Sequence, residues 1–262
     1  HIIKQQLIKK NVLVKKKVLL YKSNYLNKKK PRTCGVFLFP KKNTNKFIMC
    51  GRYVNKNTID DLTDFFGPEF FIDISSQLNQ NYNICPTQYS PVLFKSMTCL
   101  KLEDMSWGLI PSWSKDTSFA SKLINARIET IKTKPSFKNL VKKNRCIVIA
   151  NGYYEWITTP EGKQPVYIHS KENVILMAGL WTSWGNVSSF TIITKSSEGI
   201  LKNIHHRMPF LINYSDVNTY LDNNIDFSDS YKFYDAGFKY HKVSKKVNYP
   251  KNNDASCIKT ID

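Results

Sequence analysis

At residues 146–150 the chain reads Cys146-Ile147-Val148-Ile149-Ala150, five consecutive apolar residues. A short run of this kind predicts a strand that is buried on both faces. Farther along, residues 153–157 and 166–169 flank Thr159-Pro160-Glu161-Gly162-Lys163, a Pro/Gly turn that indicates a β-hairpin. Four more runs predict strands, at residues 91–93, 100–105, 174–180 and 190–194.

The sequence predicts few helices. Thr58 followed by Asp61 predicts a capped helix start, and Gly67 with Pro68 ends that helix. Residues 215–221 predict a second capped helix, and 239–247 return to short extended pieces. Strands dominate and do not alternate with helices, so we expect an α+β fold rather than a doubly wound sheet. Its core is a mixed, largely antiparallel, barrel-like β-sheet with a few short helices.

Residues 1–48 differ in composition from the rest. They hold 14 of the 39 Lys and Arg residues and no Asp or Glu, which leaves 25 basic and 20 acidic residues over 49–262. Like-charge runs repel and predict no fold. A basic nucleic-acid arm, a transit peptide and translated upstream sequence are the alternatives. We favour the last, because Met49 is the first methionine and a transit peptide would be richer in Arg and Ser. We therefore expect an unstructured leader, 1–48, outside the mature protein, and one domain, 49–262.

The spacing of the cysteines and the length of the apolar runs indicate where in the cell the protein works. The six cysteines include no C-x-x-C pair, which argues against a disulfide scaffold and a structural zinc site and favours a reducing compartment. No apolar stretch approaches the roughly 18 residues that span a bilayer, so we expect no membrane association. No Gly-rich phosphate loop appears, and we expect no cofactor or metal. The protein should work inside the cell, in a eukaryotic nucleus or a bacterial cytoplasm.

The pair Met49-Cys50 carries distinctive chemistry. Cysteine is small enough for an initiator methionine to be removed ahead of it, which would leave Cys50 with an α-amine and a thiol on neighbouring carbons. The amine, with a pKa of about 7.7–8.0, can attack an aldehyde to give a Schiff base. The thiol can then close on the imine carbon and form a thiazolidine. By position alone, however, an inert buried cysteine is the commoner case.

Six short motifs follow one another along residues 49–262. They are Met49-Cys50-Gly51-Arg52-Tyr53, Tyr82-Asn83-Ile84-Cys85-Pro86, Trp107-Gly108-Leu109-Ile110-Pro111, Asn125-Ala126-Arg127-Ile128-Glu129-Thr130, Gly152-Tyr153-Tyr154-Glu155-Trp156 and His205-His206-Arg207-Met208-Pro209. In that order and at those spacings they resemble the SRAP family, the SOS-response-associated peptidase proteins that shield abasic sites in DNA. The tail, 241–244 and 247–248, is also similar to the end of the family. The resemblance implies a SRAP-like fold and chemistry on abasic sites in single-stranded or junction DNA.

The resemblance implies four catalytic residues at matching motif positions: Cys50, Asn125, Glu155 and His205. His205, with an ordinary pKa of about 6.5, suits opening the closed sugar to its aldehyde. Glu155 is the expected proton acceptor for the α-ammonium group, and Asn125 can orient the amine and the sugar oxygens. Because the Schiff base also permits β-elimination, strand-cleaving lyase activity is an expected side reaction. His206 departs from the family, which commonly has Asp there.

Binding to DNA requires positively charged side chains that contact phosphates and flat side chains that pack against bases. Arg52, Arg127 and Arg207 each lie beside a predicted catalytic residue and are expected to clamp phosphates around a lesion. Trp156 and Pro86 are candidates for wedging against neighbouring bases. An abasic nucleotide has no base to be read, so little sequence preference is expected. We expect a monomer, with replication-fork proteins as candidate partners.

Two other functions stay open. In a thiol peptidase, Cys50 and His205 would serve as nucleophile and base, with Asn125 or Glu155 as the orienting group. In a noncovalent reader of damaged or modified DNA, the basic leader would serve as an arm, and binding would depend strongly on salt. Covalent attachment to DNA distinguishes the leading hypothesis from both.

Several aromatic and histidine residues have simpler expected roles. Trp107, Trp113 and Trp181 are expected in the core, because aromatic side chains are more often buried than free to stack on a ligand. His169 and His241 are expected to be structural. Cys85 occupies a position that is usually small and apolar in the family, without touching the four catalytic roles.

Overall fold

Five strands close into a barrel in the computed structural model, which describes residues 51–68, 70–223 and 236–261. In pairing order they are β11 (Val187–Ser196), β10 (Ile175–Trp184), β7 (Arg145–Ala150), β4 (Tyr89–Lys95) and β5 (Leu100–Trp107). Neighbours along this path are antiparallel, and β5 closes the ring by pairing in parallel with β11. The predicted mixed, largely antiparallel, barrel-like core is therefore confirmed. The expectations for residues 1–48 and for Met49 and Cys50 lie outside the described residues.

The predicted buried strand, β7, lies between β10 and β4 and is buried along its whole length. Ile147 and Ile149 belong to one apolar cluster, whereas Cys146, Val148 and Ala150 belong to a second. Successive side chains of a strand point to opposite faces, so the two clusters occupy the two faces of β7. Because both faces are apolar, the strand reads in the sequence as an unbroken apolar run.

The first helix begins and ends where the sequence predicts. In α2 (Ile59–Phe66), the Asp61 amide donates to Thr58 Oγ1 at 3.1 Å, and the Thr58 amide donates to the Asp61 carboxylate at 2.7 Å. This reciprocal capping box satisfies two amides that the helix leaves without partners. Gly67, with φ of 70°, ends the helix in a backbone conformation that favours glycine.

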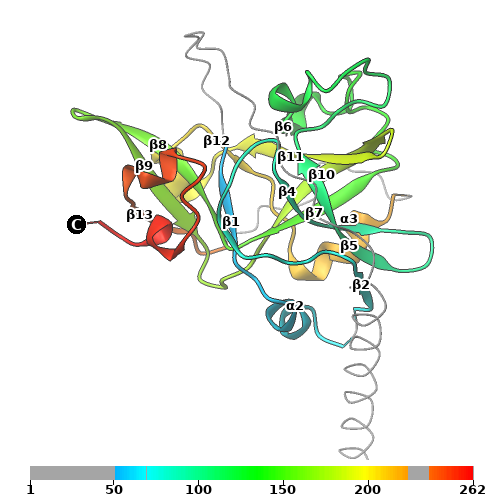
Figure 1. The fold of residues 1–262 in the computed structure, drawn as a ribbon, viewed down its shortest axis with the longest axis horizontal. Helices are drawn as coiled ribbons and strands as arrows, with labels where there is room; N and C mark the ends of the chain where they lie inside the picture. The colour runs from blue at the N-terminus through cyan, green and yellow to red at the C-terminus, as the bar shows by residue number, and fades with distance from the viewer. Residues whose placement is uncertain (1–50, 69, 224–235, 262) are drawn as a thin grey trace, which may run out of the picture. The chain divides into compact units, whose positions relative to one another are not determined.

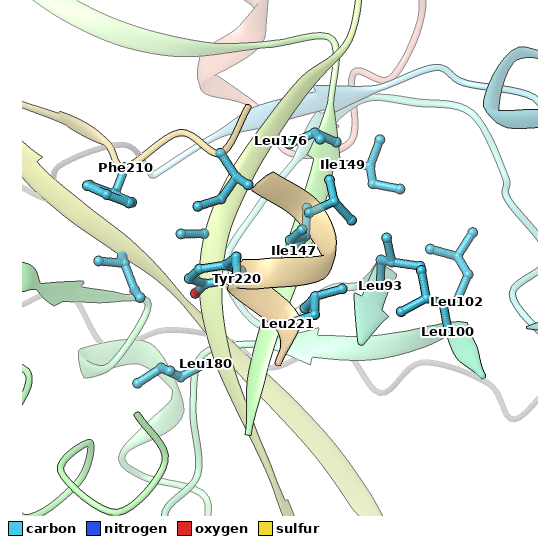
Figure 2. Packing of buried hydrophobic residues seen from close by; sticks show 14 of the residues in the cluster. Leu93, Leu100, Leu102, Ile147, Ile149, Leu176, Leu180, Phe210, Tyr220 and Leu221 are labelled. Carbon is cyan, nitrogen blue, oxygen red and sulfur yellow. The ribbon is translucent and has the colours of Figure 1, made fainter. Parts of the chain in front are cut away.

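The second helix is shorter than the sequence predicts. A 3₁₀ turn, η4 (Tyr214–Asp216), precedes α3 (Val217–Leu221), and Asp216 makes no side-chain capping hydrogen bond. Tertiary packing holds this helix instead. Figure 2 shows α3 against the apolar side chains of the first cluster, and the Tyr220 hydroxyl donates to the Gly179 carbonyl at 2.9 Å.

The predicted hairpin belongs to a second, antiparallel sheet. Its strands, in pairing order, are β13 (Lys239–Lys242), β9 (Gly162–His169), β8 (Gly152–Thr159), β1 (Tyr53–Asn55) and β3 (Asn81–Ile84). The hairpin of β8 and β9 is closed by the predicted turn, where Thr159 pairs with Gly162. Figure 1 shows β13 and the C-terminal segment, in orange and red, beside β8 and β9. Beyond β13 the tail forms a 3₁₀ turn, η5 (Lys245–Asn248), rather than more strand.

The remaining elements are short. They comprise β2 (Ile72–Ile74), β6 (Asn125–Arg127), β12 (Arg207–Pro209), and the 3₁₀ turns η1 (Ala120–Lys122), η2 (Ile128–Thr130), η3 (Gly199–Asn203) and η6 (Ala255–Ile258). Both β6 and β12 pair with the C-terminal half of β11. No helix within the described ranges is long and apolar enough to cross a membrane.

The predictions for isolated aromatic residues have mixed outcomes. Trp107 is fully buried, and its indole N–H donates to the Ile124 carbonyl at 3.0 Å. Trp181 is only partly buried. The core prediction is wrong for Trp113, which is 57% exposed in a loop, where its ring lies edge-on to Phe119. A Trp can lie outside the core when a neighbouring ring covers part of its surface.

His169 and His241 pack around a tyrosine of the second sheet. The ring of His169 stacks on Tyr167 with centroids 5.5 Å apart, and His241 lies edge-on to the same tyrosine at 5.7 Å. His241 Nε2 also lies 2.8 Å from the Ile258 carbonyl oxygen. These contacts join β9, β13 and η6, as expected of structural histidines.

Candidate active site

Two predicted catalytic residues meet between β8 and the turn that precedes β12. Glu155 lies on β8 and is 4% exposed, and His205 follows η3. The Nδ1 atom of His205 lies 3.9 Å from Oε1 of Glu155. A largely buried carboxylate beside an imidazole can accept or return a proton near neutral pH. The pair is therefore suited to general acid/base chemistry.

The backbone of Arg207 orients the imidazole of His205. The Arg207 amide donates to His205 Nδ1 at 3.2 Å, and the Arg207 carbonyl oxygen lies 3.3 Å from the same nitrogen. Neutral histidine with a bare Nδ1 accepts from the amide, whereas protonated histidine can donate to the carbonyl oxygen and faces Glu155. The surroundings thus accommodate both protonation states, as a proton-transfer group requires.

His206 lies beside this pair and is exposed. Its ring centroid is 4.3 Å from that of His205. Its pKa is lowered from the ordinary 6.5, first by partial desolvation and then by the nearby charges of His205, Arg207 and Arg127. These surroundings favour the uncharged form of His206.

The start of the described chain runs alongside Glu155. β1 pairs antiparallel with β8, and the Tyr154 amide extends this pairing by donating to the Arg52 carbonyl at 3.0 Å. Gly51 is buried. The residues that follow Cys50 are therefore hydrogen bonded to the residue that precedes Glu155. Cys50 itself lies outside the described residues.

β6 positions Asn125 and Arg127 on the same side of a strand. In the parallel pairing with β11, Asn125 lies opposite Ile192 and Arg127 opposite Thr194. Ala126, between them, is fully buried, while Asn125 is half-buried and Arg127 is exposed. Because side chains alternate along a strand, Asn125 and Arg127 share the face opposite Ala126. An amide and an accessible cation are thereby aligned side by side.

Arg207 has different surroundings from those of Arg127. Its guanidinium is buried and binds Glu129 through two contacts, Nη1–Oε1 at 2.5 Å and Nη2–Oε2 at 2.9 Å. It also donates to the Thr194 carbonyl at 2.6 Å. The Arg207 guanidinium lowers the pKa of Glu129. This bidentate pair ties the segment after β6 to β12, and phosphate binding by Arg207 stays a prediction.

Our sequence analysis missed Glu129 as a functional residue. Glu129 lies in the same motif as Asn125, and Arg207 lies two residues after His205. An acid and an arginine in two separate motifs could have indicated an ion pair. Nothing in their sequence spacing shows that the two segments meet.

Arg52 and Trp156 both contact the C-terminal segment. The Arg52 guanidinium donates to the Val247 carbonyl and, at 3.0 Å, to the Asn248 carbonyl. The Trp156 indole N–H donates to Asn248 Oδ1 at 2.8 Å, and Arg52 Cζ lies 6.0 Å from the indole centroid. Pro86 is half-buried just after β3. DNA contact by Arg52, Trp156 and Pro86 stays a prediction.

Three of the four cysteines within the described residues are buried, which disfavours nucleophilic attack. Cys146 is fully buried, which raises the pKa of its thiol well above the ordinary value, and burial also raises the pKa of Cys85. Cys257 is buried as well, and Cys99 is half-buried. Since the thiolate is the reactive form, burial of this kind lowers reactivity. Within the described ranges, no cluster of three or more His, Cys, Asp or Glu side chains could hold a metal ion.

Several known proteins are similar to this chain in sequence or in fold. Residues 49–250 match the family described as SOS response associated peptidase (SRAP). The chain is 34% identical over 224 residues to abasic site processing protein YoqW of Bacillus subtilis, covering 81% of this chain and 100% of that one. It is 30% identical over 227 residues to abasic site processing protein HMCES of Xenopus tropicalis, covering 71% and 68%.

A crystal structure of a protein from Bacteroides thetaiotaomicron has the same fold. It superposes with a TM-score of 0.66 at 24% identity, covering 81% of this chain and 100% of that one. A phage-related protein from Bordetella bronchiseptica superposes with a TM-score of 0.58, covering 74% and 94%. The family that the motifs predicted is thereby confirmed: the chain belongs to the SOS response associated peptidase (SRAP) family.

Proposed function

We propose that this protein processes abasic sites in single-stranded DNA by forming a covalent thiazolidine crosslink through Cys50. Abasic-site handling is supported by membership of the SRAP family and by the names of its relatives. The observation that carries the chemistry is the Glu155–His205 pair, 3.9 Å apart, beside the chain that directly follows Cys50. In this proposal, residues 49–262 form the active domain, the leader takes no part, and hydrolysis of the Met49–Cys50 bond exposes the α-amine.

The reaction begins with the closed sugar of the abasic site. His205 donates a proton to the ring oxygen while a solvent water takes the proton of the anomeric hydroxyl, and the hemiacetal opens to an aldehyde. Glu155 accepts a proton from the α-ammonium of Cys50, and the neutral amine attacks the carbonyl carbon. The carbinolamine then loses water and becomes an imine.

The thiol of Cys50 completes the ring. Its sulfur attacks the imine carbon, and the imine nitrogen takes up the thiol proton, so a C–S bond forms and the C=N bond becomes single. Aldehyde and aminothiol are joined with the loss of one water, and no redox partner is needed. Elimination of the phosphate β to the same imine would instead cleave the strand, which is the lyase side reaction.

Other residues of the site bind and orient the DNA in this proposal. Asn125 orients the amine and the sugar oxygens through its amide, which can donate and accept without carrying charge. Arg127, exposed on the same face of β6, binds a phosphate beside the lesion. Such contacts carry no base information, so crosslinking should depend little on the flanking sequence.

The test is covalent capture. Protein that begins at Cys50 is incubated with a single-stranded oligonucleotide in which one uracil has been converted to an abasic site. We expect a band shift that survives denaturation and an intact mass equal to protein plus DNA minus one water. Cys50→Ala should abolish the adduct, whereas Cys99→Ala, a matched change in a partly exposed thiol, should leave it unchanged. Glu155→Gln should slow adduct formation by roughly 100-fold or more.

The same assay separates the competing functions. Retaining Met49 blocks the α-amine, so that protein should bind without forming the adduct. No adduct with the wild type, or an equal amount with Cys50→Ala, would overturn the proposal. Salt-sensitive binding that persists in Cys50→Ala without any adduct would favour a noncovalent reader. Cleavage of supplied peptides that depends on Cys50 would favour a thiol peptidase.

A further inference from the structure

The loop at residues 244–252, after β13, presents an aromatic ring and three lysines to solvent. Tyr249 is 69% exposed, and Lys245, Lys246 and Lys251 are exposed around it. Single-stranded DNA is held by this combination of groups, because bases stack on aromatic rings while cations track the phosphates. We call this set of four residues the loop platform.

The backbone beneath the platform is held in place by a buried amide. Asn83 on β3 is almost fully buried, and its Nδ2 lies 3.2 Å from the Val247 carbonyl, 3.1 Å from the Tyr249 carbonyl and 2.8 Å from the Asn252 carbonyl. The Asn252 side chain in turn donates to the Lys246 carbonyl at 2.8 Å. Tyr249 is therefore presented by an ordered backbone, which lowers the entropy lost when it binds a ligand.

The loop that carries the platform contacts two residues that lie beside predicted catalytic residues in the sequence. Asn248, the residue before Tyr249, accepts from the Trp156 indole at its side chain and from the Arg52 guanidinium at its carbonyl. Trp156 follows the proposed proton acceptor Glu155 in sequence. The platform is therefore linked, through Asn248, to the residue that follows Glu155 on β8.

Charge also favours an anionic partner here. Residues 236–253 contain five lysines and no Asp or Glu. Two carboxylates lie close by: Glu161, on which the charges of Lys242 and Lys245 act, and Asp254, which accepts from the Ser256 amide at 2.7 Å. They offset part of the positive charge, and the segment as a whole remains basic.

We infer that Tyr249 stacks on a base flanking the abasic nucleotide and that Lys245, Lys246 and Lys251 contact the phosphates of that flank. The inference rests on the proposed function, because it takes the lesion to lie at Glu155. It adds binding to intact nucleotides next to the lesion, because the abasic nucleotide itself has no base to stack. An aromatic ring can stack on any base, so this contact requires no particular DNA sequence.

The experiment measures noncovalent binding by fluorescence anisotropy. The probe is a single-stranded oligonucleotide with one tetrahydrofuran residue, which mimics the abasic sugar but has no aldehyde to react. Tyr249→Ala should weaken binding about 5- to 150-fold, the range for removing one base–aromatic stack. Tyr249→Phe, which keeps the ring, should bind like the wild type. Tyr89→Ala removes an exposed tyrosine from β4 and is the matched control, with no expected change.

A second set of probes identifies the stack. Further tetrahydrofuran residues replace the two nucleotides on the 5′ side or on the 3′ side of the first. On the probe that lacks the contacted bases, Tyr249→Ala and wild type should bind with equal affinity. On the probe that keeps those bases, Tyr249→Ala should bind more weakly than wild type. Lys245→Gln combined with Lys246→Gln should lower the slope of log K against log salt by about 0.7 per lost phosphate contact.

The outcomes separate this inference from the proposed function. Unchanged binding by Tyr249→Ala would overturn the inference, as would a loss that persists on both base-free probes, because either result means no stacking. If Tyr249→Ala weakens binding as expected but wild type forms no covalent adduct with true abasic DNA, only the proposed chemistry fails. Circular dichroism that matches the wild type excludes misfolding as the cause of any loss.

Discussion

The barrel and the second sheet differ in the side-chain contacts that stabilise them. Barrel strands such as β7 have apolar side chains on both faces, so apolar packing adds to the hydrogen bonds between strands. At its site end, the second sheet is joined to the C-terminal segment by polar side chains that bind backbone carbonyls, chiefly those of Asn83 and Arg52. The second sheet and this segment also share a buried apolar cluster of Val54, Tyr154, Tyr167, Val243 and Val247, so directed hydrogen bonds add to packing there.

This difference suits the two tasks. Apolar burial is strong and non-directional, so it stabilises a scaffold without specifying single atoms. Hydrogen bonds contribute less net stability but demand particular distances and angles, so they position groups such as Trp156 beside the site. Variants in the barrel should therefore affect the stability of the whole fold, whereas variants in the polar contacts should act locally.

The largest expected effect comes from the barrel. Ile147→Ala removes a fully buried side chain from β7 and should lower the free energy of unfolding by about 2–5 kcal/mol, because both burial and packing are lost. Urea unfolding measures this loss. The matched control is Ile200→Ala, an exposed isoleucine in η3, which should change stability by less than about 0.5 kcal/mol. Equal effects from the two variants would contradict the comparison.

An intermediate effect is expected from the polar contacts. Asn83→Ala removes the side-chain donor to the Tyr249 and Asn252 carbonyls, and one donor to the Val247 carbonyl, which Arg52 also contacts. The substitution should lower the free energy of unfolding by about 1–3 kcal/mol. Amide hydrogen exchange should quicken within residues 247–252 and stay unchanged in β7. The exposed Asn79→Ala is the control and should alter neither quantity. If exchange quickened equally in β7, the view of the polar contacts as local would be wrong.

The smallest expected effect is at the Glu129–Arg207 pair, since the Glu129 side chain is 49% exposed. Glu129→Gln should lower the free energy of unfolding by no more than about 1 kcal/mol. Arg207 lowers the pKa of Glu129 in the folded state, so the pair stabilises fully above the unfolded pKa of about 4.3. Its contribution should vanish as pH falls through the folded pKa.

The free energy of unfolding, measured from pH 7 down to pH 3, tests the direction of this pH dependence. The difference between wild type and Glu129→Gln should be constant above about pH 5 and shrink below it. Lys101→Gln removes two longer pairings, to Asp73 at 3.9 Å and to Glu103 at 3.7 Å. It is the control and should have a smaller effect. A difference that grows as pH falls would contradict the pairing.

Much of the fold could be predicted because its determinants are local. The apolar run of β7, the turn between β8 and β9 and the capping box of Thr58 each lie within a few residues of the element they specify. The predictions failed where packing decided. Trp113 lies outside the core, and the helix predicted over 215–221 begins as a 3₁₀ turn without a side-chain cap. The parallel pairing that closes the barrel depends on where distant segments meet.

The motifs alone predict the residues of the candidate site, because Asn125, Glu155 and His205 each lie in one of them. The contacts of these residues depend on how the chain folds. Folding brings His205 to Glu155, binds Arg207 to Glu129 and attaches the C-terminal loop to Asn83. The physical reason is that periodicity and capping act between residues close in sequence. Polar contacts across dozens of residues form only once burial of the apolar strands has determined the path of the chain.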